Sequence, residues 1–217
     1  MKKITFIIAA TLLFIGCKSK EEKANEIIKR NLCTLYDLEG YEPINTKIDS
    51  AFNSIYNDTI VLKHAHQILY IYTHEAKPHA LKLDEKEHLI NLMTTAGLSF
   101  NSSSVVKAIM EYRETVKKLE ACNARMAIEQ DSIIERAKLI KRDFCGWNAT
   151  HEFKFKDENG KDATGKYMYI LDKDFKKVIY LSDLYTGSYD AMKGAIDEAL
   201  ESKKESDETD SKNKNEL

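Results

Sequence analysis

The chain has 217 residues, 31% of them charged, and a formal net charge of −2. Because the charges nearly cancel, the composition excludes a strongly basic surface of the kind that binds nucleic acid. A hydrophobic content of 43% is enough for a folded core. With only 8 Gly and 2 Pro, the chain favours long helices over a turn-rich β fold.

The N-terminus, MKKITFIIAATLLFIGC, has the pattern of a signal peptide. Two lysines precede an uncharged stretch, Ile4–Ile15, which is too short to span a bilayer as a lasting anchor. The following Gly16 and Cys17 complete the run Leu-Phe-Ile-Gly-Cys, which resembles the lipobox of bacterial lipoproteins, with Phe14 where Leu is usual. The resemblance implies cleavage between Gly16 and Cys17 and acylation of the Cys17 thiol.

A lipid on Cys17 would make a membrane the first partner of this protein, since each buried methylene contributes about 0.8 kcal/mol. We therefore expect a signal peptide over 1–16 and a polar tether over 17–23. The tether also resembles the surface-export signal of Bacteroidetes-type lipoproteins, which implies the outer membrane and the cell surface. An ordinary secretory signal or a short membrane anchor is the alternative.

The part that follows, 24–200, is expected to fold as a single domain of the α+β class. An amphipathic helix over 21–38 is indicated by apolar residues at helical spacing, and Gly40 and Pro43 end it. Alternating residues around 44–48 indicate a short strand. A helix is then expected from Ile60, with a kink or break near Lys77 because Pro78 interrupts it.

The longest predicted element is a helix over 105–144, which contains no Gly or Pro before Phe144. Steps of four and three residues along it meet apolar side chains at nearly every position, which is a heptad pattern. The apolar stripe needs a partner, so the segment is expected to pair with 60–96 in an antiparallel hairpin within 58–144. Only Asn123 and Gln130 interrupt the stripe. They either fix the register of the hairpin or form a polar binding site between its helices.

The pattern then changes from helix to strand. Alternation predicts strands over 147–155, 166–171 and 178–181, and hence a sheet region at 146–183. A last helix is expected from Ser188, followed by a disordered polar tail over 201–217. The complete prediction is a long antiparallel helical hairpin inserted into a small four-stranded antiparallel sheet, which N- and C-terminal helices flank and cover.

Two further segments carry a family resemblance. The segment around Tyr41-Glu42-Pro43-Ile44 and the later Gly146-Trp147 with His151-Glu152-Phe153 resemble uncharacterised lipoproteins of Bacteroidetes. In those proteins, the two segments bracket a variable helical region. The resemblance implies the envelope location and transfers no activity, cofactor or catalytic residue.

No side-chain pattern in the sequence predicts a metal, a cofactor or a catalytic centre. The His-Glu-x-x-His zinc motif would need histidine where Pro78 stands, and His64 and His66 point about 200° apart on a helix. Segment 157–162 is interpreted as a hairpin turn, since Met168 replaces the bidentate Glu of a calcium loop. Among the remaining cysteines, Cys122 and Cys145 would lie about 30 Å apart on a continuous helix, too far for a disulfide. Cys33 with Cys145 is the one pair considered, and free thiols are the simpler interpretation.

The sequence therefore favours a non-enzymatic binding or structural protein of the cell envelope, with a protein or a glycan as its ligand. The candidate binding surface is aromatic: Trp147, Tyr167, Tyr169 and Tyr180. The same residues would also suit the core of the sheet. The alternatives are an exported enzyme whose site forms only in the fold, and a scaffold that self-associates through the hairpin. Oligomeric state does not follow from the sequence.

Overall fold

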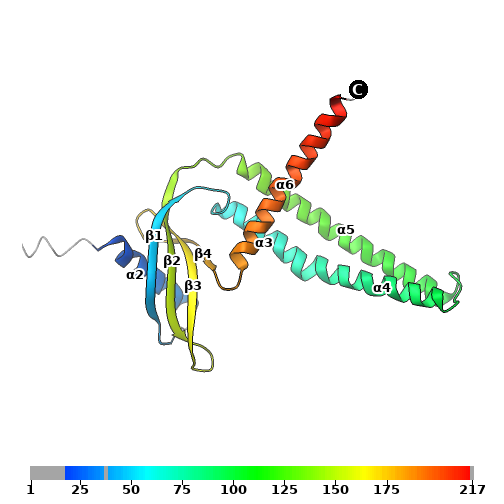
Figure 1. The fold of residues 1–217 in the computed structure, drawn as a ribbon, viewed down its shortest axis with the longest axis horizontal. Helices are drawn as coiled ribbons and strands as arrows, with labels where there is room; N and C mark the ends of the chain where they lie inside the picture. The colour runs from blue at the N-terminus through cyan, green and yellow to red at the C-terminus, as the bar shows by residue number, and fades with distance from the viewer. Residues whose placement is uncertain (1–17, 37–38, 216–217) are drawn as a thin grey trace, which may run out of the picture. The chain divides into compact units, whose positions relative to one another are not determined.

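The computed structural model describes residues 18–36 and 39–215, with side chains as far as Lys203. The expected cleavage site at Gly16 and Cys17 lies outside the described residues. The fold is α+β, with a four-stranded antiparallel sheet, a long helical hairpin and flanking helices, as the sequence predicted (Figure 1). Among the described residues, no helix has both the length and the apolar character needed to cross a membrane.

The described chain forms two compact units rather than the single domain expected from the sequence. The sheet unit extends to Asn53 and resumes at Arg142–Tyr189, and the helical unit comprises Ser54–Lys141 and the segment from Asp190 onward. The long hairpin has its own core, and this allows it to be a unit by itself. The C-terminal helix groups with the helical unit, whereas the sequence placed it on the sheet.

The sheet unit is an antiparallel meander in the order β1-β2-β3-β4. Its strands are β1 (Glu42–Phe52), β2 (Phe144–Lys156), β3 (Asp162–Asp172) and β4 (Val178–Asp183). Ala149 on β2 pairs with Ile48 on β1 and with Tyr169 on β3. Because the side-chain period of a strand is two, this register places alternate residues of β2 and β3 on one apolar face.

Helix α2 (Lys20–Leu35) covers that apolar face. It begins with a capping box, in which the Ser19 hydroxyl accepts from the Glu22 amide and the Glu22 carboxylate accepts from the Ser19 amide. The buried side chains of α2 and of the strands form one core: Ala24, Ile27, Ile28, Leu32, Ala149, Phe153, Tyr169 and Leu171. The amphipathic pattern of the first helix thus finds its partner in the alternating pattern of β2 and β3.

The helical unit contains α3 (Thr59–Ile71), the π-helical turn η1 (Tyr72–Ala76), α4 (Lys77–Thr95), α5 (Ser103–Ala137) and α6 (Ser188–Asn215). With 35 residues, α5 is about 52 Å long. It runs antiparallel to α3 and α4, as Figure 1 shows. Near Lys77, where a kink or break was expected, the regular α-helix is interrupted by the π-helical turn.

Asp58 ties the open end of the hairpin together. Its carboxylate caps α3 by accepting from the amides of Ile60 and Val61, and it also accepts from the guanidinium of Arg136 on α5, with Nη2 2.7 Å from Oδ2. The hydrogen bond from Arg136 is the largest cause of a lowered pKa at Asp58. One side chain therefore fixes both the start of α3 and its register against the last turns of α5.

Two boundaries differ from the sequence prediction. Helix α5 ends at Ala137, not at Phe144, because Phe144 already pairs with Phe52 in the ladder between β1 and β2. Helix α6 continues to Asn215, within the segment 201–217 that was expected to be disordered. Its Lys- and Glu-rich sequence lacks Gly and Pro after Gly194, so nothing in it stops a helix.

Candidate functional site

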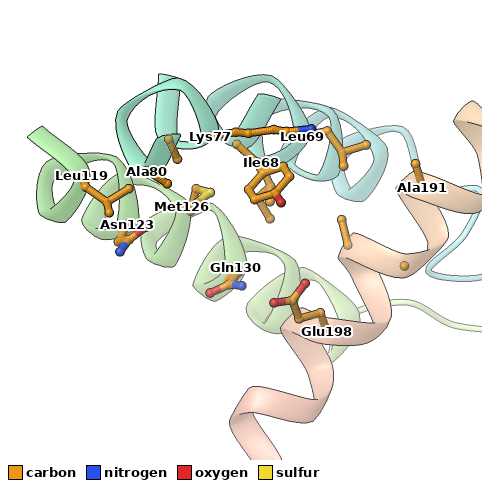
Figure 2. A pocket seen from close by; sticks show the side chains of 14 residues that line it. Ile68, Leu69, Lys77, Ala80, Leu119, Asn123, Met126, Gln130, Ala191 and Glu198 are labelled. Carbon is orange, nitrogen blue, oxygen red and sulfur yellow. The ribbon is translucent and has the colours of Figure 1, made fainter. Parts of the chain in front are cut away.

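The helical unit contains a pocket of about 790 Å³ between its helices, within the range typical of ligand sites. Residues of α3, η1, α4, α5 and α6 contribute to it (Figure 2). Its lining is Ile68, Leu69, Tyr72, Ala76, Lys77, Ala80, Leu119, Asn123, Met126, Gln130, Ala191, Gly194, Ala195 and Glu198. We refer to it as the helical pocket.

The π-helical turn forms one wall of the helical pocket. The Lys77 amide bonds back to the Tyr72 carbonyl, five residues earlier, and Pro78 directly follows. Since proline has no N–H to donate, the regular bonding pattern cannot continue through it, and a wider turn accommodates the change. Such turns commonly occur at functional sites, and here the turn places both Tyr72 and Lys77 on the pocket.

Short side chains leave the space open. The wall from the hairpin presents Ala76 and Ala80, and the wall from α6 presents Ala191, Gly194 and Ala195. A Cβ atom added at Gly194 would meet no atom within 4 Å, so the space beside α6 is empty. The pocket adjoins a small core of Ile71, Ala76 and Cys122, against which Leu119 and Met126 pack.

The polar groups of the helical pocket come largely from α5 and α6. Asn123 and Gln130 lie seven residues apart on one face of α5, about 10.5 Å along its axis. Figure 2 shows the Gln130 amide and the Glu198 carboxylate of α6 pointing toward one another across the pocket. Of the two interpretations of the interrupted stripe, this geometry favours a polar binding site between helices over residues that only fix register.

This set of groups suits binding better than proton transfer. Two amides, each both donor and acceptor, face an apolar floor, and neither can serve as an acid or a base. The two charged side chains of the lining, Lys77 and Glu198, are exposed to solvent. The pocket can therefore bind a molecule that has hydrogen-bonding groups on one side and aliphatic groups on the other.

The aromatic residues that the sequence selected as a contact surface do not form one. Trp147, Tyr167 and Tyr169 share the sheet face that α2 covers, while Tyr180 pairs with Ile170 on the opposite face. Tyr169 is fully buried, so it belongs to the core. Burial raises the pKa of Tyr169 and of Tyr167 above the ordinary tyrosine value. Tyr167 and Tyr169 occupy inward positions of the half-buried strand β3. This position explains both their place in or against the core and their raised pKa.

A second polar cluster, which sequence reasoning missed, lies inside the sheet unit around His151. The side chain is fully buried, and both ring nitrogens are bonded: Nε2 lies 2.9 Å from the Tyr41 hydroxyl and Nδ1 lies 2.8 Å from Thr46 Oγ1. Thr46 in turn donates to Asn25 Oδ1 on α2. The bonds therefore run in one direction, with Tyr41 donating to Nε2 and Nδ1–H donating to Thr46.

This arrangement requires a neutral imidazole, because Nε2 must accept. Burial lowers the pKa of His151 to about 4 and raises the pKa of Tyr41 to about 12. The cluster is enclosed by Phe153 and α2 and is not part of any pocket described for the sheet unit. We interpret it as a structural link between α2, β1 and β2.

The remaining candidates do not assemble into a site. Cys33 is exposed, Cys122 is buried and Cys145 is half-buried, all three as free thiols. His64 contacts Glu129 instead of His66. No group of three metal-binding side chains occurs within 18–36 and 39–203. A recess of about 370 Å³ beside Phe155 and Tyr185 has Asp183 as its one charged lining residue.

Comparison of the chain with family models, with curated proteins and with solved structures finds no match. The geometry of the helical pocket is therefore the basis for a functional assignment.

Proposed function

We propose that this protein is a non-enzymatic binding protein of the bacterial cell envelope, attached to a membrane through a lipid on Cys17, and that the helical pocket binds its ligand. The observation that carries the binding role is the position of Asn123 and Gln130. These two residues break an otherwise apolar heptad stripe, and both line the same pocket. A polar residue at such a position lowers the stability of a helical hairpin, and contact with a ligand would explain why two are present.

Of the two ligand classes considered from the sequence, a peptide segment of a partner protein fits the pocket better than a glycan. Ile68, Leu119 and Met126 offer aliphatic contacts for apolar side chains. The side-chain amides of Asn123 and Gln130 match the peptide group, which also has one donor and one acceptor. Their separation of about 10.5 Å corresponds to about three residues of an extended chain.

The pocket assignment is tested by filling the pocket. Peptides selected from a random library on the full-length protein are expected to be rich in aliphatic residues. Gly194→Leu should weaken their binding by at least about tenfold, which corresponds to 1.4 kcal/mol. The new side chain enters empty space, so the helix itself is not disturbed. Titration calorimetry of one selected peptide measures the change.

Ala127→Leu is the matched control, because it adds the same side chain at an exposed position of α5 that does not line the pocket. Affinity should stay at the wild-type value. Equal affinity for the wild type and Gly194→Leu, or a library that yields no binder, would reject the helical pocket as a peptide site.

The attachment is tested separately by feeding cells radiolabelled palmitate. The wild-type protein should incorporate the label and lose its first 16 residues. Cys17→Ala should remove the label, because the acylated thiol is gone. Label retained in Cys17→Ala, or wild-type protein in the cytosol with Met1 intact, contradicts the lipid anchor without affecting the pocket.

A further inference from the structure

The closed end of the helical hairpin has an unusual composition. From Leu89 to Val106 there is no Asp, Glu, Lys, Arg or His, although 31% of the whole chain is charged. This segment includes the last turns of α4, the connecting loop and the first turn of α5, at the end of the hairpin where α4 and α5 join (Figure 1). We call it the hairpin tip.

The hairpin tip exposes large apolar side chains. Leu92 is 54% exposed, Leu98 45% and Phe100 65%. Helix α4 has no buried residue at all among its 19, so the tip has almost no core of its own. Exposed apolar residues scattered singly are ordinary, but a cluster on an uncharged surface indicates contact with an apolar environment.

Part of the backbone at the tip is satisfied by local bonds. The Leu98 amide bonds to the Met93 carbonyl and the Gly97 amide to the Thr94 carbonyl, which closes α4 with Gly97 at a φ of 84°. The hydroxyls of Thr94 and Thr95 donate to carbonyls in the preceding turn of α4, and Ser102 caps α5. These local bonds lower the cost of moving the groups that form them out of water.

The charged residues resume directly behind the tip. Lys86 on α4 binds Glu111 on α5, with Nζ 2.6 Å from Oε2, and Lys107 follows Val106. An uncharged end with a charged belt behind it matches a lipid interface, where apolar groups enter the acyl boundary and charges stay with the headgroups.

A second copy of the chain fits this surface less well. The tip is the narrow end of two helices, and two such ends meet over a small area, whereas stable protein interfaces bury at least about 1,200 Å². A bilayer needs no complementary shape, since burial of apolar surface is non-directional.

We propose that the hairpin tip inserts into the interface of a lipid bilayer, with Leu98 and Phe100 at the greatest depth. This membrane contact is independent of the lipid on Cys17 and of the ligand of the helical pocket. It gives the helical unit its own attachment to a membrane surface.

The test uses a fluorescent reporter at the tip of the full-length protein. Trp147 is the one tryptophan of the chain, so Phe100→Trp in a Trp147→Phe background reports on the tip alone. The protein is reconstituted into vesicles of phosphatidylethanolamine and phosphatidylglycerol that contain doxyl-labelled lipid. We expect the emission to shift to shorter wavelength and to lose at least about half its intensity by quenching, as for a side chain buried about 5–10 Å into the boundary between headgroups and acyl chains.

Ile128→Trp in the same background is the matched control. Ile128 is 64% exposed, almost the same as Phe100, and lies on α5 among charged residues. Its emission should be neither shifted nor quenched. Leu98→Asp added to the tip reporter should abolish the quenching, and it does not threaten the fold because Leu98 is exposed.

The experiment has two arms. In one, the doxyl lipid is in the vesicles that carry the protein; in the other, it is in added protein-free vesicles. The arm that shows quenching tells whether the tip enters the bilayer to which the protein is attached or a second bilayer. Quenching in either arm supports the proposal. A tip reporter as unquenched as Ile128→Trp in both arms overturns it. So does a shift that depends on protein concentration without quenching, which would assign the tip to self-association. Neither result bears on palmitate labelling or on peptide binding.

Discussion

Replacing Gly146 with alanine is expected to lower the free energy of unfolding of the sheet unit by about 3 kcal/mol. Gly146 lies in β2, where it pairs with Ala51 on one side and with Asp172 on the other. A Cβ atom at this position would lie 1.9 Å from the backbone oxygen of Leu171. The contact is with a paired backbone, which cannot move without separating β2 from β3. Urea unfolding followed by the fluorescence of Trp147 measures the loss in this unit.

Gly160→Ala is the control for the part of this loss in unfolding free energy that comes from backbone strain at a positive φ. Gly160 has a φ of 72° in the turn between β2 and β3, and a Cβ atom there would meet nothing within 4 Å. The strain of a positive φ alone should cost about 1 kcal/mol. If Gly146→Ala lowers the free energy of unfolding no more than Gly160→Ala does, β2 and β3 do not approach each other at Gly146 as closely as the structure shows.

The sequence predicted the elements well because their patterns are long and regular. Alternation along 147–155 located β2, and the heptad stripe located α5. The ends of these elements were less accurate, since Phe144 is apolar and fits the helical stripe as well as the strand. Its pairing with Phe52 places Phe144 in the strand instead of the helix. That pairing joins residues far apart in the chain, so the local pattern does not reveal it.

Only one wall of the helical pocket, the one formed by α5, could be predicted from the sequence. Asn123 and Gln130 stand out because they interrupt an apolar stripe, so the face of α5 that bears the pocket could be selected in advance. The wall from α6 could not be, because the apolar side with Ile196 and Ala199 suits a sheet as well as a helical hairpin. The π-helical turn at Tyr72–Ala76 was visible only as a kink at Pro78.

The cluster around His151 was missed although a signal was present. His151 occupies an inward position in the alternation of β2, between Ala149 and Phe153, where a polar side chain requires a partner. The partners Tyr41 and Thr46 precede it by 110 and 105 residues, so their identity comes from tertiary structure. A polar residue at a buried strand position would have been a sufficient reason to expect such a network.

Lowering the pH from 7 to 4 is expected to remove about 3 kcal/mol of stability from the sheet unit through His151 alone. The pKa of this buried imidazole is lowered from 6.5 to about 4, and each unit corresponds to about 1.4 kcal/mol. At a pH between the unfolded-state pKa of 6.5 and the folded-state pKa of about 4, the unfolded chain binds the proton and the folded chain does not. The stability is therefore complete above pH 6.5, decreases as the pH falls, and reaches its lower limit near pH 4.

The partners of His151 offer nothing that would stabilise the charged form. Tyr41, Thr46 and Asn25 are neutral, and Nε2 would lose its role as acceptor on protonation. Lys29 on α2 lies 5.9 Å from the centre of the Tyr41 ring and adds positive charge nearby. Protonation must therefore break the bond with Tyr41 as well as place a charge among aromatic rings.

Urea unfolding of the wild type and of His151→Phe, followed by Trp147 fluorescence at several pH values, separates this effect from the titration of carboxylates. His151→Phe is expected to be less stable at pH 7, because Tyr41 and Thr46 lose their partner, but its stability should change about 3 kcal/mol less between pH 7 and pH 4. His66→Gln, at an exposed position of α3, should retain the full wild-type dependence. If His151→Phe shows the same pH dependence as the wild type, the imidazole is not held neutral in the folded protein, and the one-directional chain of bonds through it cannot be correct.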